Sequence, residues 1–379
     1  MYGGKILLTA LFYSLMVQIV FYIIAYKTGF WNLPKWLIIT DTVVSQVLII
    51  SYLLNGIIRV IALCYRLNIV KRVLFIMLLW VPIVNLFILR SLIKTAKEEY
   101  DYETTKKAFD DQRIESQVCQ TKYPLMLVHG IGFKDWRYFN YWGRIPKELK
   151  KNGGAVYYGN QDACGTVAYN SEMIKRRILE IVEETGCEKV NIIAHSKGGL
   201  DARYAISKLG ISQNVASLTT MGVPHRGSGF ADVGLKLPDK LVRIITNFLD
   251  KRFRQMGDSN SDAYTAIHQF TSDYSEEFNR DVPDADGVYY QSYASVMRGM
   301  FSFGILAIPY LCTKKFGKND GLVTIESAKW GNFRGTFESK HYRGISHGDL
   351  IDLKRDDYKG FDPRETYVNI VSELKEMGY

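Results

Sequence analysis

The residues best suited to chemistry lie at positions 190–199 (VNIIAHSKGG), where an apolar run meets a serine and two glycines. This pattern predicts a strand, a sharp turn and a helix, with the Ser196 hydroxyl exposed at the turn. Ala194 and Gly198 are small enough for the strand and helix backbones to pass closely. A serine held in this way is suited to nucleophilic acyl transfer; the alternative is an ordinary glycine-rich junction between a strand and a helix.

An acyl-transfer site also needs hydrogen-bond donors for the oxyanion that forms on the carbonyl oxygen. Residues 127–133 (LVHGIGF) form a glycine-rich loop directly after an apolar run. We expect the backbone N–H groups of Ile131 and Lys197 to converge as the oxyanion hole. His129 precedes the nucleophile in the chain, and we expect it to shape this loop.

A serine on such a turn is followed along the chain first by the acid and then by the base. The histidines downstream of Ser196 are His225, His268, His341 and His347. His347 lies in a turn-like stretch, residues 344–349 (GISHGD), after the last expected strand, and it is the predicted base. His341 would alternate within that strand and remains the alternative base. His225 lies beside a strand end, and His268 lies in an insertion.

The predicted acid is Asp320, in a tight loop at residues 318–323 (KNDGLV) between the last two expected strands. An Asp-Gly pair is also a plain turn signal, so the type of residue does not decide the matter. Its position before His347 favours the acid role. Asp286 is the alternative acid.

From residue 123 onward, short apolar runs alternate with amphipathic helical stretches, which is typical of a parallel sheet with helices on both faces. The expected strands are residues 124–128, 155–158, 190–194, 215–221, 288–294 and a last one near 337–342. The expected helices are residues 171–185, 198–209 and 364–377. Residues 121–379 are therefore predicted to form a single α/β catalytic domain.

The motifs of this domain resemble those of the bacterial true lipases of the Bacillus and Pseudomonas–Burkholderia type. The resemblance covers most of residues 124–347 and is carried by VHGIG (128–132), AHSKGG (194–199), GVPHRGS (222–228), GVYY (287–290) and NDGLV (319–323). It implies the α/β-hydrolase fold, a Ser196–Asp320–His347 triad and an oxyanion hole from Ile131 and Lys197. It also implies hydrolysis of carboxylic esters of lipids, by a triacylglycerol lipase or carboxylesterase that needs no cofactor.

The larger members of that family bind a structural calcium ion, which this sequence matches only in part. Asp349 fits one ligand position, two residues after the predicted base. The region of the other carboxylate, residues 297–313, contains no Asp or Glu, and Leu353 stands where a glutamine ligand is expected. We therefore expect no bound calcium.

A long insertion, residues 227–286, separates two of the expected strands, and such a length exceeds ordinary connections. Apolar residues recur within it at helical spacing: Leu241, Val242, Ile244, Ile245, Phe248 and Leu249. One interpretation is a helix packed on the core. The other is a lid that covers the acyl pocket and turns toward lipid when it opens.

Residues 1–92 are predicted to be a membrane region with two or three transmembrane helices, followed by a polar linker at 93–120. The apolar stretches are residues 6–26, 37–58 and 73–89, and the first two are long enough to cross a bilayer. A cleaved signal peptide is the alternative for the first stretch. The third stretch contains Pro82 and has an interfacial position as its alternative.

The net charge of +9 does not indicate a nucleic-acid partner, because ten Lys and Arg against three Asp and Glu in residues 1–100 account for +7 of it. Basic residues at membrane flanks explain this excess. We expect a multi-pass protein of the bacterial cytoplasmic membrane, with a lipid or ester substrate, and the sequence does not predict on which side the catalytic domain lies.

The cysteines Cys119, Cys164, Cys187 and Cys312 show no metal-ligand spacing, and we expect buried thiols with at most one disulfide. Three other functions stay open on the same residues. They are an acyltransferase, an amide or thioester hydrolase, and a non-catalytic membrane scaffold.

Overall fold

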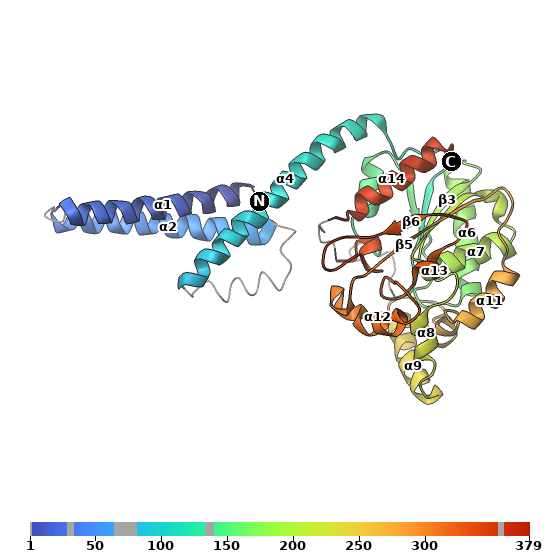
Figure 1. Ribbon diagram of the computed structural model, residues 1–379. Coiled ribbons are helices and arrows are strands. Elements are labelled where there is room, and N and C mark those ends of the chain that lie inside the picture. The colour runs from blue at the N-terminus through green and yellow to red at the C-terminus, as the bar shows by residue number, and fades with distance from the viewer. Residues whose placement is uncertain (1, 29–33, 64–81, 133–139, 355–359) are drawn as a thin grey trace. The chain divides into compact units, whose positions relative to one another are not determined.

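The computed structural model describes residues 2–28, 34–132 except 64–81, 140–354 and 360–379. The chain divides into two compact units, Met1–Gln112 and Arg113–Tyr379. Figure 1 shows both units, and each is described by itself. The division falls within the expected polar linker, which is helical up to Ser116 as the last part of α4 (Pro82–Ser116).

The first unit contains two long apolar helices, α1 (Tyr2–Thr28) and α2 (Lys35–Leu63), which pack against each other. Glycines permit this packing, because a Cβ atom on Gly56 would lie 2.6 Å from the Leu8 side chain. The first two apolar stretches of the sequence lie inside these helices. The third stretch, residues 73–89, lies outside the described residues up to position 81, and its remaining residues form the start of α4.

Both helices are long and apolar enough to cross a membrane, by length and composition. Within their most apolar windows only 11% of α1 and none of α2 is buried, so the protein itself does not cover these side chains. This exposure differs from that of a core helix in a soluble protein. A signal sequence passes the same length and composition test as a membrane span.

The second unit is built on a six-stranded sheet in the order β2-β1-β3-β4-β5-β6, with every neighbouring pair parallel. The strands are β1 Leu125–Val128, β2 Val156–Tyr158, β3 Val190–His195, β4 Val215–Met221, β5 Tyr289–Ser295 and β6 Asn332–Phe337. Apolar runs such as β1 and β4 are buried throughout because helices cover both faces of the sheet.

Alternate residues of the strands enter two separate cores. Leu125 and Leu127 of β1 pack on one face with α5 (Ile145–Lys151) and α14 (Pro363–Glu376), whereas Met126 and Val128 pack on the other. That second face is covered by α6 (Val167–Thr185) and α7 (Lys197–Lys208) (Figure 1). The predicted layered α/β architecture is therefore confirmed.

The last strand was predicted wrongly, because β6 covers Asn332–Phe337 and not residues 337–342. The strand lies at the edge of the sheet and is only partly buried, so its apolar alternation is weak. His341 consequently lies beyond the strand and not within it. The helices α6, α7 and α14 agree with the expected ones to within four residues at each end.

The long insertion is helical and contains α8 (Gly229–Gly234), α9 (Asp239–Gln255), α10 (Ala263–His268) and α11 (Ser272–Asp281). A second helical excursion follows β5, with short helices at Met300–Ser302 and Gly304–Leu306 and then α12 (Ala307–Lys314). Short helices also occur at Ser212–Asn214, Ile325–Ala328 (α13) and Asp349–Ile351. In Figure 1, α8, α9 and α12 lie at the same end of the unit.

Candidate active site

Ser196 stands at the turn between β3 and α7, in a backbone conformation with φ 53° and ψ −133°. A non-glycine residue with positive φ here costs on the order of 1–3 kcal/mol, which the surrounding sheet and helix must offset. The serine is the N-terminal cap residue of α7, so the free N–H groups of the first helical turn follow it directly. The predicted sharp turn is therefore present, with the serine at its apex.

Close backbone contacts explain the glycines around this turn. A Cβ atom on Gly198 would lie 2.3 Å from the carbonyl oxygen of His129. One on Gly199 would lie 2.4 Å from the Val223 side chain. The expected close passage of strand and helix at Gly198 is confirmed, because any larger residue would push α7 off the sheet.

Asp320 and His347 are brought together by a hydrogen bond of 2.8 Å from His347 Nδ1 to Asp320 Oδ2. Asp320 Oδ1 accepts two further bonds, from the N–H groups of Leu322 and Val323. The His347 backbone N–H also donates to the Asp320 carbonyl oxygen. This pairing fixes the proton on Nδ1 and leaves His347 Nε2 with a lone pair.

The pair lies beside the serine turn. The His347 ring is 4.3 Å, centroid to centroid, from the ring of His195, the residue before Ser196. A Cβ atom on Gly222, directly after β4, would lie 3.1 Å from Asp320 Oδ2 and 3.3 Å from His347 Nδ1. Ser196 and the Asp320–His347 pair therefore lie close together at the carboxyl ends of the parallel strands, and the triad role of the three residues stays a prediction.

His195, in the serine turn, contacts His347 through one ring nitrogen and Tyr141 through the other. Nε2 is 3.2 Å from the His347 carbonyl oxygen and must carry the proton, since a carbonyl only accepts. Nδ1 then accepts a 2.6 Å bond from the hydroxyl of Tyr141. Burial lowers the pKa of His195 well below its usual value, and the neighbouring His347 adds to this effect. His195 is thus held neutral and is hydrogen-bonded to the backbone of His347.

The glycine-rich loop after β1 lies against the serine, as expected for an oxyanion loop. A Cβ atom on Gly130 would lie 2.8 Å from Ser196 Cβ, and Ile131 lines the same cavity as Ser196. His129 is buried, and its ring nitrogens contact the carbonyl oxygens of Gly130 and Gln161. These contacts agree with the expectation that His129 shapes the loop. The residues that follow Gly132 in this loop, up to position 139, lie outside the described chain.

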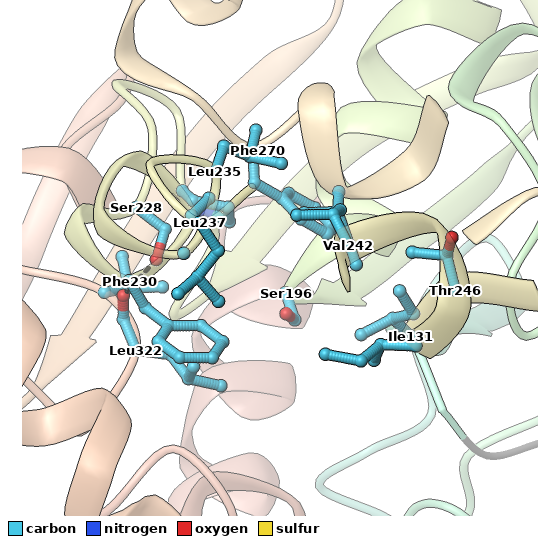
Figure 2. Close-up of a pocket in the computed structure, with 16 residues that line it drawn as sticks. Ile131, Ser196, Ser228, Phe230, Leu235, Leu237, Val242, Thr246, Phe270 and Leu322 are labelled. Atoms are coloured by element: carbon cyan, nitrogen blue, oxygen red, sulfur yellow. Dashed lines mark hydrogen bonds between the residues drawn. The ribbon is translucent and has the colours of Figure 1, made fainter. Parts of the chain in front are cut away.

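A cavity of about 310 Å³ opens above Ser196. Figure 2 shows the serine between Phe230 and Leu322 on one side and Ile131 and Val242 on the other. Its described lining includes Ser196, Ser228 and Thr246 as hydroxyl groups and contains no charged side chain. The Ser228 hydroxyl donates a hydrogen bond to the Leu322 carbonyl oxygen. The cavity is thus suited to an apolar chain and offers little to a charged head group.

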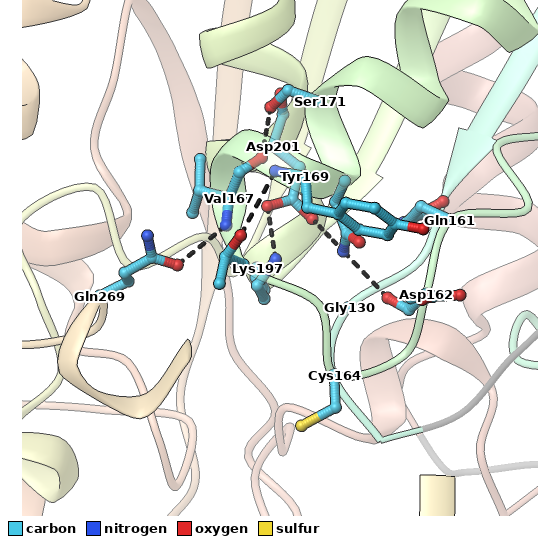
Figure 3. A network of polar contacts seen from close by, with 12 residues as sticks. Gly130, Gln161, Asp162, Cys164, Val167, Tyr169, Ser171, Lys197, Asp201 and Gln269 are labelled. Atoms are coloured by element: carbon cyan, nitrogen blue, oxygen red, sulfur yellow. Dashed lines mark hydrogen bonds and ion pairs between the residues drawn. The ribbon is translucent and has the colours of Figure 1, made fainter. Parts of the chain in front are cut away.

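A buried ion pair holds the first turn of α7, which carries the predicted oxyanion donor Lys197. Lys197 Nζ lies 2.6 Å from Asp201 Oδ1, and both side chains are 1% exposed. Asn170 donates to the second carboxylate oxygen, and burial raises the pKa of Asp201 despite the ammonium group (Figure 3). Loss of either charged partner would leave the other buried and unpaired, at a cost of about 3–5 kcal/mol.

Two aspartates, Asp162 and Asp258, join the loop around residue 163 to the loop that follows α9. Asp258 accepts from the N–H groups of Ala163 and Cys164, while Asp162 accepts from those of Ser259 and Asn260. We call this pair the carboxylate clamp. Ala163 in turn accepts the N–H of Gly132 in the oxyanion loop at 3.1 Å. The insertion is therefore hydrogen-bonded, through one intermediate loop, to the predicted oxyanion donors.

The alternative site residues lie elsewhere. Asp286 is exposed and precedes β5, so it lies at the N-terminal ends of the parallel strands, whereas Ser196 lies at their C-terminal ends. His225 is buried, contacts Arg203 and Thr220, and has its pKa lowered well below the usual value by burial. His268 contacts the carbonyl oxygen of Tyr264 within its own insertion.

The sequence did not indicate several residues that hold the site in place, namely Asp201, Tyr141 and the two aspartates of the carboxylate clamp. The Lys197–Asp201 pair has helical i,i+4 spacing, which is a visible signal once α7 is predicted. Tyr141 and the carboxylate clamp have no such signal, because their partners lie 54 and more than 90 residues away along the chain.

The calcium ligand and cysteine predictions have different outcomes. Asp349 accepts bonds from the N–H and hydroxyl of Ser346, and Arg343 lies 3.6 Å from its other oxygen. Among the described residues no three His, Cys, Asp or Glu side chains gather as metal ligands, and the expectation of no calcium stays a prediction. Cys119 and Cys164 are buried free thiols, but Cys187 and Cys312 are partly exposed, so the expectation of buried thiols is wrong for these two.

Comparison with solved structures identifies the fold. A Bacillus licheniformis lipase superposes with a TM-score of 0.51 and 21% identity over 67% of this chain and 93% of that one. A metagenomic carboxyl esterase superposes with a TM-score of 0.53 and 17% identity over 68% and 76% of the two chains. The second unit therefore has the α/β-hydrolase fold.

Sequence relatives narrow the class further, although no family model matches the chain. A yeast protein named triacylglycerol lipase 2 (Saccharomyces cerevisiae) is 28% identical over 63% of this chain and 74% of its own length. A triacylglycerol lipase of Pseudarthrobacter phenanthrenivorans is 33% identical over 44% of this chain, which spans about half (55%) of that relative. The chain is thus a homologue of bacterial and yeast triacylglycerol lipases.

Proposed function

We propose that the protein is a serine hydrolase that cleaves carboxylic esters of lipids. The observation that carries the proposal is the meeting of Ser196, at a strained turn, with the hydrogen-bonded pair Asp320–His347 beneath an apolar cavity. Serine-dependent acyl transfer needs these three groups and donors for the oxyanion. The homologous lipases support an ester as the bond that is cleaved.

The proposed reaction has two acyl-transfer steps. His347 Nε2 takes the proton of Ser196 as its oxygen attacks the ester carbonyl, and Asp320 stabilises the resulting imidazolium through the Nδ1–H bond. The N–H groups of Ile131 and Lys197 bind the oxyanion. The imidazolium then protonates the leaving alcohol, and water releases the acyl group by the same steps.

The cavity favours a fatty acyl chain as the part of the substrate that is bound. Its walls are Phe230, Leu235, Leu237, Ile245 and Leu322, among other apolar residues, and each buried CH₂ group contributes about 0.8 kcal/mol. Longer acyl chains should therefore bind more tightly until the cavity is full.

The test is hydrolysis of p-nitrophenyl esters of increasing chain length by wild type and Ser196→Ala, both solubilised in detergent. We expect serine-dependent release that rises with chain length, and covalent labelling of the wild type alone by a fluorophosphonate probe. Activity confined to short chains would indicate an esterase. Unchanged activity of Ser196→Ala would refute the proposed nucleophile.

An acyltransferase uses the same acyl-enzyme, which an alcohol or amine then intercepts in place of water. Product analysis with a competing alcohol separates the two: hydrolysis yields the free acid, and transfer yields the new ester. Amide and thioester model substrates, assayed with the same variants, test the leaving group. A non-catalytic scaffold would show no serine-dependent product in any of these assays.

We also propose that α1 and α2 anchor the protein in a membrane, and that α9 is a lid over the cavity. Exposed apolar side chains on both helices support the anchor, although a signal sequence would share them. Determination of the N-terminal residue of the purified protein tests the anchor, since cleavage before residue 35 would remove α1.

For the lid, the supporting observation is that Val242 and Ile245 of α9 line the cavity while Ile244 and Phe248 face solvent.

A further inference from the structure

Besides the outer face of α9, residues 298–318 form an exposed apolar surface outside the cavity. Phe301, Ile305 and Ile308 are 86%, 80% and 71% exposed, more than any apolar side chain of α9. Single exposed apolar residues are ordinary on protein surfaces, but three this exposed within eight residues are a patch. We call residues 298–318, which include α12, the docking segment.

The inner side of the docking segment is packed against both loops of the proposed triad. A Cβ atom on Gly321, next to Asp320, would lie 2.9 Å from Leu306, and one on Gly348, next to His347, would lie 2.8 Å from Phe303. Leu306 is buried and also packs against Leu322, which lines the cavity. The apolar outer side is therefore fixed in place directly beside the site.

The charge of the docking segment is entirely positive. It carries Arg298, Lys314, Lys315 and Lys318, and residues 297–319 contain no Asp or Glu. Lys354 adds a further ammonium group 3.9 Å from the Phe303 ring centroid. Lys318 is paired with Glu338 at 4.0 Å, which leaves Arg298, Lys314 and Lys315 as the cations of the segment that set its charge. An apolar face bordered by such basic residues is complementary to a bilayer surface with anionic head groups.

We propose that the docking segment binds the surface of an anionic lipid bilayer, with Phe301, Ile305 and Ile308 in the interface and Lys314 and Lys315 on the head groups. A second copy of the chain is a poorer partner, because a two-fold contact through this segment would oppose two sets of like charges. The functional role of this contact rests on the proposed lipid hydrolysis, because docking here would bring the wall of the cavity close to lipid substrate. The contact itself does not depend on turnover.

The test uses the full chain in nanodiscs whose lipids carry brominated acyl chains, which quench tryptophan on contact. All measurements are made in the Ser196→Ala background, so that lipid contact is measured without hydrolysis. We compare Ile305→Trp with Leu179→Trp, a matched control at an exposed apolar residue of α6, and subtract the signal of the native tryptophans. We expect extra quenching for Ile305→Trp in phosphatidylglycerol nanodiscs, and little in phosphatidylcholine or at high salt.

Charge reversal provides the second measurement. Because one lysine near an anionic surface contributes about a fivefold preference, Lys314→Glu with Lys315→Glu should lower the docked fraction of Ile305→Trp at least about fivefold. In the otherwise native chain, the same pair should leave hydrolysis of a water-soluble short ester unchanged, since neither lysine lines the cavity.

Three results would overturn the proposal. They are equal quenching of Ile305→Trp and Leu179→Trp, equal quenching in the two lipids, and a detergent-solubilised dimer that Ile305→Asp converts to a monomer. The last result would identify a second copy as the partner. A docked chain that shows no serine-dependent hydrolysis would instead refute the proposed function and leave the docking inference intact.

Discussion

The two sides of the cavity are built in different ways. On the side of the sheet, polar contacts fix each group: the Asp320 carboxylate accepts three hydrogen bonds, and Lys197 is paired with Asp201 in the interior. On the side of the insertion, α9 buries only Val242 and Thr246 among its 17 residues. The first side is held by directional bonds, whereas α9 presents apolar side chains to the cavity and makes its polar contacts away from it, through Asp239, Asp250 and the loop that follows the helix.

This difference separates rate from selectivity. Hydrogen bonds place atoms to within a fraction of an ångström, so changes on the sheet side should slow every substrate alike. Apolar contact has no direction and scales with buried area, so changes in α9 should depend on the acyl chain. The following predictions test this contrast, from the largest expected effect to the smallest.

The largest effect is expected from Asp320→Asn. The amide keeps the volume of the side chain, but it no longer holds the proton on His347 Nδ1, and kcat should fall by about 10⁴-fold for all chain lengths. Rates with short and long p-nitrophenyl esters measure this loss. Asp286→Asn, at an exposed carboxylate beside the N-terminal ends of the strands, is the matched control and should leave the rates unchanged.

Disruption of the carboxylate clamp should have a smaller effect, of about 10²-fold on kcat. In Asp258→Asn an NH₂ group opposes one of the N–H donors of Ala163 and Cys164, and the displaced loop carries Gly132 of the oxyanion loop with it. Because the oxyanion forms only in the transition state, KM should change little.

Asp262→Asn is the control for Asp258→Asn, since this carboxylate caps α10 and does not bind residues 163 and 164 through its side chain. A rise in KM with unchanged kcat in Asp258→Asn would mean that the clamp supports the cavity and not the oxyanion loop. Circular dichroism of both variants measures whether the fold is retained.

Ile245→Asp with Phe248→Asp should reduce turnover of long-chain esters about tenfold and leave short-chain turnover nearly unchanged. The carboxylates remove apolar contact from the cavity wall and from the outer face of α9. Leu179→Asp, on α6, is the control for a surface charge. Equal losses for short and long esters would contradict a lid and favour a fixed structural helix.

The smallest effect concerns stability at acidic pH. Burial lowers the pKa of His225 well below its usual value, so the folded chain keeps it neutral while the unfolded chain protonates it below about pH 6.5. The unfolded state then binds more protons, and the free energy of unfolding should fall by up to about 1.4 kcal/mol per pH unit as the pH decreases from there. Urea unfolding of the full chain in detergent at several pH values measures this slope.

His225→Gln should reduce the slope, and His195, whose pKa burial also lowers, should account for part of the remainder. His268→Gln is the control, at a partly exposed histidine. The same slope in His225→Gln and wild type would contradict the assignment of His225 as a buried neutral group.

The sequence alone predicted the elements that local patterns determine. The strand before Ser196, the small residues after it and the helix that follows are encoded within ten consecutive residues, and the apolar runs of the central strands predict a sheet buried on both faces. The order of acid and base after Ser196, together with the turn-like loops around Asp320 and His347, selected these residues as triad candidates, with Asp286 and His341 left as alternatives. Edge strand β6 was misplaced because partial burial weakens the periodic signal.

Only the tertiary structure decided the contacts that join distant segments. Tyr141 bonds to His195, and Asp162 and Asp258 bond to backbone N–H groups about a hundred residues away. Hydrogen bonds of this kind depend on how loops meet above the sheet, and neither residue type nor periodicity encodes that meeting. The same holds for the docking segment, where the packing of Leu306 and Phe303 against the loops of Asp320 and His347 decides which apolar residues face outward.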